Sequence, residues 1–283
     1  MEIKFENVSY SYLSGTPLQV DALKDVTTTI LPNNINALIG PSGSGKSTMI
    51  ELINGLKLPT KGVVHVGKHK LRNNIRIVNA NKLRFDIGVV FQNPEDQFFQ
   101  KTVKKEIEFG MKYFGYKVDK IEERIKNALK MVGLDDSYLP RNPFELSGGE
   151  KRKVAIASIL AFNPEVIILD EPTNGLDSSG KEALIKLIKM LKTKYNKTII
   201  VVSHDVDILY RFVDNVIILS NGRLLMQGNK FDVFKNVELL TTNGVKVPRI
   251  VEFIHKVKEK TGKYLGDIDD VNDLIKEIYQ NVQ

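Results

Sequence analysis

The sequence predicts an α/β fold built on a mostly parallel sheet, with antiparallel strands near the N-terminus, an inserted helical subdomain and a small C-terminal helical appendage. Short apolar runs alternate with helical patterns over most of the chain, which is typical of this fold class. The runs at 166–169, 198–202 and 216–219 have little polar interruption, as expected of parallel strands covered on both faces. A glycine-rich stretch at 40–48 joins one such run to a helical pattern.

The predicted strands follow in order along the chain. Alternating apolar side chains predict the first strand, and short apolar runs bounded by polar residues or glycine predict the others. They span residues 3–12, 23–30, 35–40, 86–92, 165–172, 197–204 and 214–222. Helical spacing follows the glycine-rich stretch and recurs at 119–132, 149–162 and 179–195. Because the block from about 95 to 160 has helical patterns and no convincing strand, we interpret it as the helical subdomain.

The C-terminal part of the chain differs from the rest in its pattern of apolar residues, which have helical spacing. We place a boundary at residue 228, with the main domain over 1–228 and a helical region over 229–283. Apolar residues at helical spacing form two stripes there. The stripes consist of Ile250, Phe253, Ile254 and Val257, and of Val271, Leu274, Ile275 and Ile278. Such stripes need a partner surface, which the two helices could give each other or find in another chain.

Composition narrows the class of protein. Of the 283 residues, 42% are hydrophobic and 27% are charged, an ordinary balance for a chain that buries a core. The net charge of +7 permits an anionic partner without selecting one. There is no cysteine, which excludes disulfides and thiolate metal sites. We expect no signal peptide, and the longest uncharged apolar stretch, 154–162, is far shorter than the roughly 20 residues of a transmembrane helix.

The glycine-rich stretch has the pattern G-x-x-x-x-G-K-S between a strand and a helix. Its glycines let backbone N–H groups approach phosphate oxygens closely, and the helix start adds its positive dipole end. Lys46 can reach the β- and γ-phosphates of a nucleotide, and the Ser47 hydroxyl can bind Mg²⁺. The alternative to a phosphate site is a flexible turn between the strand and the helix. The predicted phosphate-binding residues are Gly40, Pro41, Ser42, Gly43, Ser44, Gly45, Lys46, Ser47 and Thr48.

Two carboxylates end the apolar run "VIILDE". Asp170 should emerge at the carboxyl edge of the sheet, where ligands of open α/β sheets bind, and would hold Mg²⁺ through water. Glu171 follows directly and could polarise an attacking water. The alternative is a pair of solvated acids before a proline turn.

A second candidate phosphate cradle lies in "ELSGGEKRKVAIA". Ser147, Gly148 and Gly149 precede a helix, and such a helix start can bind an anion. One nucleotide does not need two cradles from one chain, so the second makes sense if it closes on the nucleotide of another chain. The alternative is a helix N-cap beside a loose loop.

With these stretches in place, the sequence resembles an ATP-binding-cassette ATPase over about residues 2–228. "GPSGSGKST" is similar to the Walker A motif of that family, "LSGGE" to its signature and "VIILDEP" to its Walker B motif. The stretch "TNGLD" resembles the loop in which Asp177 contacts the opposite subunit. The resemblance implies a P-loop NTPase fold, ATP and Mg²⁺ as ligands, and two subunits that sandwich two ATP molecules.

The resemblance also gives roles to three single residues. Gln92 matches the glutamine that contacts Mg²⁺ and the lytic water, and His204 matches the switch histidine that contacts the γ-phosphate. Tyr12 matches the aromatic residue that stacks on adenine, with Tyr10 as a competing candidate. Without the motifs around them, such residues would more often be a surface amide, a strand-end histidine and a core aromatic.

Within the family, the chain most resembles the ATPase subunits of energy-coupling-factor transporters, which import vitamins and metal ions. "SYLSGTPLQVDALKDV", "FQNPEDQFFQKTVKKEIEFG" and the helical tail carry this likeness. It implies a peripheral protein on the cytoplasmic face of the membrane that pairs with a paralogous ATPase or with itself through the tail. The other implied partners are a transmembrane coupling subunit and a substrate-binding membrane subunit. Two residues depart from the pattern: Glu150 replaces the usual signature glutamine, and Asn174 precedes the Gly-Leu-Asp of "TNGLD".

An aromatic cluster follows Gln92, and two explanations stay open for it. It could pack the helical subdomain, or form the groove that receives a coupling helix of the membrane subunit. Its members are Phe98, Phe99, Phe109, Tyr113, Phe114 and Tyr116.

Four other functions compete with that of a transporter of this subtype. A DNA-associated ATPase of the same fold usually inserts long coiled coils between P-loop and signature, whereas about 100 residues without heptads separate them here, so we expect no nucleic-acid partner. A regulatory cassette would lack Lys46, Glu171 or His204, and all three are present here. A translation-associated ATPase normally carries two cassettes in one chain, whereas this chain has one. An ATPase subunit of another ABC transporter class remains the main alternative.

Overall fold

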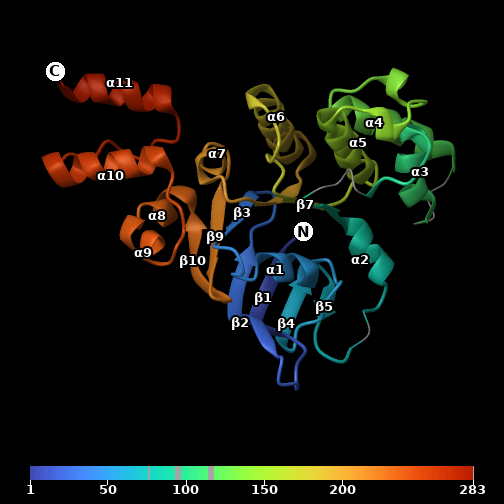
Figure 1. Ribbon diagram of the computed structural model, residues 1–283, viewed down its shortest axis with the longest axis horizontal. Coiled ribbons are helices and arrows are strands. Elements are labelled where there is room, and N and C mark those ends of the chain that lie inside the picture. Colours follow the sequence, from blue (N-terminus) through green and yellow to red (C-terminus); the bar gives the residue numbers. More distant parts are fainter. Residues whose placement is uncertain (76, 93–96, 114–117, 283) are drawn as a thin grey trace.

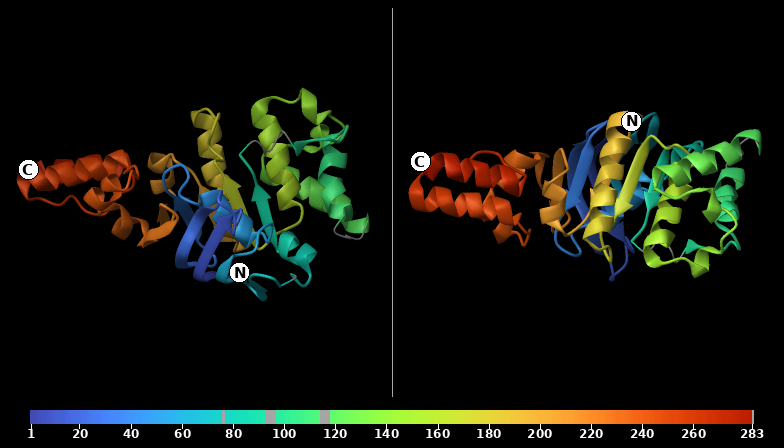
Figure 2. Two further views of the ribbon diagram at one scale, coloured as in Figure 1. Left: turned by 60° about the horizontal axis from the view of Figure 1, so that its bottom comes forward. Right: turned by 90° about the horizontal axis from the view of Figure 1, so that it is seen from above.

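The computed structural model describes the whole chain except residues 76, 93–96, 114–117 and 283 and the side chains of 118, 119, 281 and 282. Two sheets lie at its centre, with a group of helices at one end and the C-terminal helices at the other (Figures 1 and 2).

Six strands form the larger sheet, in the order β10-β9-β3-β8-β7-β6, and all neighbours are parallel except β10 and β9. They are β3 (Ile35–Ile39), β6 (Ile87–Val90), β7 (Val166–Asp170), β8 (Thr198–Val202), β9 (Asn215–Ser220) and β10 (Arg223–Asn229). In β8, Ile199 and Val201 pack into one core, and Ile200 and Val202 into another on the opposite face. Because both faces are covered, the strands read as apolar runs, and the predicted mostly parallel α/β sheet is confirmed.

The smaller sheet is antiparallel, with strand order β2-β1-β4-β5. Its strands are β1 (Ile3–Tyr12), β2 (Val20–Ile30), β4 (Lys61–Val66) and β5 (His69–Leu71). Helix α1 (Lys46–Ile53) lies between the two sheets and buries Met49 and Leu52 completely in the core that they share. The sequence did not predict β4, β5 and β10, because none of them contains a long apolar run.

The first of the remaining helices of the main domain buries Leu83 in the same core as α1, and the others pack on the other face of the larger sheet and beside it. They are α2 (Ala80–Asp86), α3 (Val103–Tyr113), α4 (Val118–Met131), α5 (Gly148–Leu160), α6 (Ser178–Tyr195) and α7 (Val206–Tyr210). Helices α3, α4 and α5 form one group at the end of the molecule, and the described part of 95–160 contains no strand. No helix among the described residues is long and apolar enough to cross a bilayer.

One side chain joins the edges of the two sheets. The amide of Gln227 in β10 accepts from the backbone N–H of Thr29 (3.4 Å) and also contacts the Thr28 hydroxyl and the Thr29 carbonyl in β2. Nearby, Lys24 N–H donates to the Gly222 carbonyl at 2.7 Å. These contacts fix the smaller sheet over the larger one.

The C-terminal region has two parts that pack differently. It contains α8 (Lys230–Phe234), α9 (Val237–Thr242), α10 (Arg249–Thr261) and α11 (Val271–Val282). Phe234 and Leu240 are fully buried in the core of the main domain. Ile254, Leu265 and Leu274 form a small core of their own between α10 and α11. That residues 229–283 form a separate region stays a prediction. Among the described residues of this range, α10 and α11 share a core of their own, whereas Phe234 and Leu240 belong to the core of the main domain.

Two polar contacts hold α10 and α11 to the main domain. Lys230 is buried, contacts the carboxylate of Asp269 and donates to the carbonyl of Tyr210 at 2.8 Å. Asp207 of α7 accepts from the backbone N–H of Arg249 at 2.7 Å and from its Nε at 2.9 Å. Because Pro248 at the N-cap of α10 has no polar side chain, Asp207 supplies the cap from another helix.

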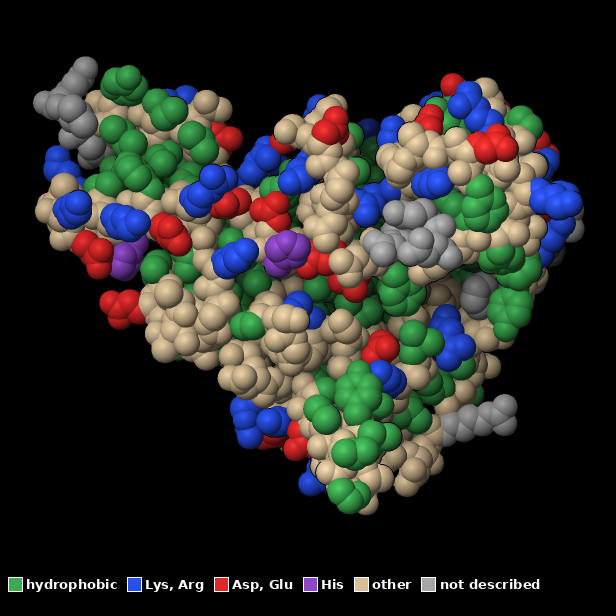
Figure 3. All heavy atoms as spheres, viewed as in Figure 1, with side chains coloured by type: hydrophobic (Ala, Val, Ile, Leu, Met, Phe, Trp, Pro, Cys, Tyr) green, Lys and Arg blue, Asp and Glu red, His purple; other side chains and the backbone are tan. Residues whose placement is uncertain are grey.

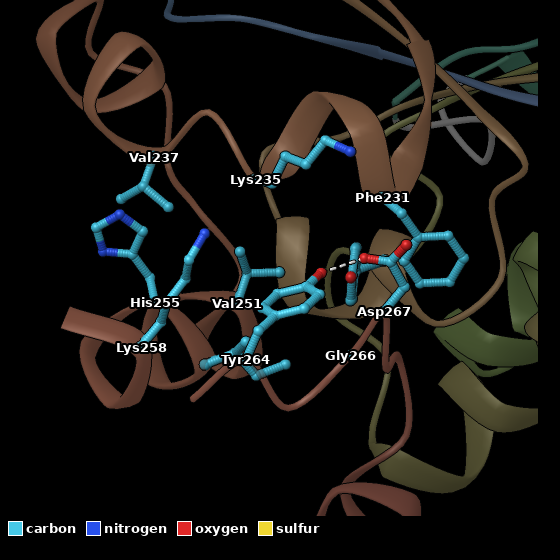
Figure 4. Close-up of a pocket in the computed structure, with 11 residues that line it drawn as sticks. Phe231, Lys235, Val237, Val251, His255, Lys258, Tyr264, Gly266 and Asp267 are labelled. Atoms are coloured by element: carbon cyan, nitrogen blue, oxygen red, sulfur yellow. Dashed lines mark hydrogen bonds between the residues drawn. The ribbon is translucent and has the colours of Figure 1, made fainter. Parts of the chain in front are cut away.

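A cavity of about 360 Å³ lies between α8, α10 and the loop before α11 (Figure 4). Apolar side chains such as Val251 and Phe231 line it, and within the lining the hydroxyl of Tyr264 donates to Asp267. The cavity marks the seam where the helical pair leaves the main domain.

Replacing Asp207 by alanine should lower the free energy of unfolding by about 1 kcal/mol, because the first turn of α10 loses its cap. Urea unfolding would measure the loss, and hydrogen exchange should show faster opening of the α10 amides. Asp136→Ala is the control, since Asp136 is exposed and lies 3.6 Å from Lys126 in a surface pair. Equal losses in the two variants would contradict the capping role.

Candidate nucleotide-binding site

The loop from Gly40 to Gly45 connects β3 to α1 and requires glycine at two positions. A Cβ atom on Gly40 would lie 2.2 Å from the carbonyl oxygen of Leu219. Gly45 has a φ of +104°, and a Cβ there would lie 2.6 Å from the Ala22 carbonyl oxygen. The backbone of β9 and β2 therefore leaves no room for side chains at these points, and the loop is forced into a tight cradle.

The cradle has the properties of an anion site. Lys46 is half-buried and donates from Nζ to the carbonyls of Gly40 and Pro41, both at 2.8 Å. Burial lowers the pKa of Lys46, while Glu171 and Asp170 act in the opposite direction. No side chain caps the start of α1, so its first N–H groups are free to bind phosphate oxygens.

All nine predicted phosphate-binding residues lie in this cradle or the first turn of α1. Ser42, Gly43 and Ser47 are exposed at its surface. Ser44 is buried, and its hydroxyl has no hydrogen-bond partner in the part of the chain that is described. An unpaired buried hydroxyl and an uncapped helix start both fit a nucleotide phosphate chain.

Glu171 lies at the carboxyl edge of the sheet, directly after β7. Its backbone N–H donates to the Val202 carbonyl at 2.8 Å, and its φ of +48° is in the left-handed region. The carboxylate accepts from the Ser203 hydroxyl at 3.0 Å and lies 3.0 Å from Nδ1 of His204. The structure thus brings together two of the three residues predicted to be catalytic, Glu171 and His204, and adds Ser203, which was not predicted.

Asp170 precedes Glu171 and is partly buried. Burial raises its pKa, the neighbouring Glu171 adds to the rise, and Lys46 opposes it. A carboxylate in this position is stabilised by a nearby cation, which fits Mg²⁺. No cluster of three carboxylate or imidazole groups exists among the described residues, so Mg²⁺ would depend on Asp170, Ser47 and Gln92 together with phosphate and water oxygens.

The structure leaves the Gln92 side chain exposed after β6, in reach of solvent. The backbone carbonyl oxygen of Gln92 lies 3.4 Å from Nη2 of Arg152 in α5. A role for Arg152 could not be predicted from the sequence, because one arginine in "GEKRKVAIA" looks like any solvated helix residue. Its burial in the structure distinguishes it.

Between the two candidate aromatics, the geometry favours Tyr12. Its hydroxyl lies 3.0 Å from Oγ1 of Thr48 in α1 and accepts from Lys57 Nζ at 2.8 Å. Tyr10 packs against the core between the sheets and meets the Tyr12 ring edge-on, with centroids 5.0 Å apart. Tyr12 is therefore the aromatic residue in direct contact with the phosphate-binding segment.

The signature residues lie elsewhere. Ser147 caps α5 in a reciprocal capping box with Glu150, and Asp177 caps α6 by accepting from Gly180 N–H at 2.7 Å. Ser147, Gly149 and Asp177 share the lining of a cavity of about 360 Å³ between α5 and α6. Its described lining includes no residue of 40–48. The chain therefore does not bring its two phosphate cradles together.

Glu150, the departure from the usual signature, has a structural explanation. Its carboxylate accepts from the Tyr138 hydroxyl at 2.6 Å, from the Ser147 N–H at 2.9 Å and from the Ser147 hydroxyl at 2.8 Å. These donors, Tyr138 first, lower the pKa of Glu150 to about 2. The extra negative charge is held within the helix start.

Known proteins are similar to this chain over most of its length. Residues 23–174 match the family model described as ABC transporter. The energy-coupling factor transporter ATP-binding protein EcfA2 of Spiroplasma kunkelii is 44% identical over 92% of this chain and 86% of that protein. EcfA2 of Clostridium acetobutylicum is 39% identical over 98% of this chain and 97% of that protein.

Two solved structures are also similar. One is the dimeric post-hydrolysis state of the ATP-binding cassette MJ0796 bound to ADP and Pi, with a TM-score of 0.71, 34% identity, and coverage of 81% of this chain and 98% of that chain. The other is cbiO1 from Clostridium perfringens, part of the ABC transporter complex cbiONQ, with a TM-score of 0.72, 35% identity, and coverage of 89% and 98%.

Replacing Glu150 by glutamine should flatten the acid dependence of stability. A carboxyl group with a pKa of about 2 in the folded chain and an ordinary value near 4.5 stabilises the fold above pH 4.5. That contribution disappears as the pH falls toward 2. Urea unfolding between pH 7 and pH 3 should therefore show a smaller loss for Glu150→Gln than for the wild type. Parallel curves would contradict this, and exposed Glu123→Gln serves as the control.

Proposed function

Because the chain belongs to the ABC transporter family, and within it to the energy-coupling factor ATP-binding proteins, we propose that it is the ATP-hydrolysing subunit of a membrane importer of this class, for vitamins or metal ions. The observation that carries the proposal is the contact of Glu171 with both Ser203 and His204, within electrostatic reach of Lys46. An ATPase subunit of another ABC transporter class is the alternative.

In this mechanism the cradle binds the phosphate chain, and Lys46 exchanges its contacts with the loop carbonyls for contacts with the β- and γ-phosphates. Glu171 orients and polarises the attacking water, and Ser203 and His204 hold its carboxylate in place. His204 is largely exposed, so it can also reach the γ-phosphate. Mg²⁺, when bound, would neutralise charge that develops on the transferred phosphoryl group. Catalysis is then mostly positioning and charge stabilisation.

A second subunit would complete each site. Ser147, Gly149 and Asp177 lie together on α5 and α6, on a cavity whose described lining excludes this chain's own cradle. They are positioned to close on a nucleotide bound by another chain, either a paralogous ATPase or a second copy. Each ATP would then lie between the cradle of one chain and the signature of the other.

The appendage offers a surface that could hold the pair together between cycles. Ile254 and Leu274 are buried between α10 and α11, which accounts for part of the predicted stripes. On α11, Val271, Ile275 and Tyr279 remain 61%, 46% and 72% exposed at successive four-residue steps. Hydrophobic side chains gather over this end of the molecule (Figure 3). Their spacing suits the tail of a partner ATPase.

The membrane subunit would dock on the helical subdomain. Phe99 and Phe109 are 56% and 49% exposed and meet edge-on, with centroids 4.7 Å apart, beside a cavity of about 250 Å³. Phe98 is buried, so packing explains that member of the aromatic cluster. Phe114 and Tyr116 lie outside the described residues. A transmembrane coupling subunit at this groove would place the chain on the cytoplasmic face of the membrane and link it to a substrate-binding subunit.

Replacing Glu171 by glutamine should preserve ATP binding and lower turnover by roughly 10²–10⁴-fold, because the amide cannot polarise water as a carboxylate does. Steady-state ATPase assays of the reconstituted pair would test this, with the partner's own catalytic glutamate disabled in every sample. Exposed Glu238→Gln is the control. Near wild-type turnover would remove Glu171 from the mechanism.

The double variant Val271→Glu/Ile275→Glu should weaken pairing in the absence of ATP, since it places two charges on the exposed face of α11. Light scattering without nucleotide would follow the dimer, and circular dichroism would confirm the fold. The matched control changes exposed polar positions of the same helix, Asn272→Glu/Lys276→Glu. A stable dimer in the first variant would show that this face does not join the subunits.

A further inference from the structure

Arg152 is a buried cation whose partners lie in two other functional segments. It is 9% exposed and belongs to α5, two residues beyond the capping box at the signature. Nη1 donates to the carbonyl of Pro172 at 3.2 Å and to the carbonyl of Asn174, and Nη2 lies 3.4 Å from the carbonyl of Gln92. One guanidinium therefore touches the backbone after Glu171 and the backbone of Gln92.

The chemistry of these contacts requires arginine. A buried cation needs acceptors to replace water, and here backbone carbonyls supply them. Guanidinium presents several N–H donors in a rigid planar fork, so one side chain can hold two segments at a fixed separation. Lysine has a single charged centre and cannot span the same carbonyls in one fixed geometry.

The segment that Arg152 holds is conformationally demanding. Glu171 has a φ of +48° and Gly175 a φ of +71°, and Asn174 N–H closes a turn onto the Glu171 carbonyl at 3.2 Å. Asp177, the N-cap of α6, lies two residues after this turn. The position of the Pro172–Gly175 turn therefore determines where Glu171 and Asp177 point.

We propose that Arg152 is a positioning residue for hydrolysis, which fixes the Pro172–Gly175 turn and the Gln92 backbone to α5. Through it, the signature helix, the Glu171 segment and the backbone at Gln92 move as one unit. This inference rests on the proposed ATP hydrolysis. It assigns a coupling role to a side chain whose described hydrogen bonds go to backbone carbonyls.

The test compares Arg152→Met and Arg152→Lys with Lys130→Met, which removes an exposed charge from the neighbouring α4. Titration with a fluorescent ATP analogue should give dissociation constants within about threefold of wild type for all variants, because the cradle is untouched. In the reconstituted complex, kcat should fall at least tenfold for Arg152→Met with KM nearly unchanged. Arg152→Lys should recover only part of the loss, and Lys130→Met should retain the wild-type kcat.

The outcomes separate this inference from the proposed function. A wild-type kcat in folded Arg152→Met, or full recovery in Arg152→Lys, would overturn the positioning role while leaving ATP hydrolysis intact. An equal rise in the dissociation constant and in KM would also overturn it, because the side chain would then serve nucleotide binding. If Arg152→Met does not fold, Arg152→Lys retains the charge and decides alone. Absence of ATPase activity in the wild-type complex would refute the proposed function itself.

Discussion

The parallel pairing of β3, β8 and β7 is the constraint on which the rest of the site depends. Asp170 pairs with Val202, and Leu38 pairs with the same residue on the other side of β8. The three strands therefore end at one level, and the segments that follow them meet at one edge. Without that register, the lysine of the first segment and the carboxylates and histidine of the other two would not lie at one edge of the sheet.

This edge concentrates features that a core would not tolerate. A lysine is half-buried, a glutamate has a left-handed backbone, and two glycines press against neighbouring carbonyls. Each costs stability, of order 1 kcal/mol or more for a strained residue. The cost is offset by apolar burial on both faces of the sheet, where Ile199 and Ile200 alternate between two cores. Such a division between a rigid apolar sheet and a strained polar edge is how the fold positions groups for catalysis.

The motifs could be predicted because each depends on local sequence. Seven strands and the cradle could be predicted from apolar runs and glycine spacing. Strand β10 could not be predicted, because its half-buried residues show no clear period and because Gln227 contacts partners about 200 positions away in the sequence. Ser203 and Arg152 were missed for the same reason, since their partners are distant in sequence. Glu150 looked like a departure from pattern until the structure placed the Tyr138 hydroxyl against it.

Helix α7 connects the segment that ends in His204 to the appendage. It starts two residues after His204, and its five residues include Asp207, which caps α10. Its last residue, Tyr210, accepts from buried Lys230, which in turn contacts Asp269 before α11. Both polar contacts that hold the appendage therefore involve α7. In the proposed dimer, α11 would join the two chains, and the appendage that contains it is thus held by the same short helix that follows the Glu171–His204 contact.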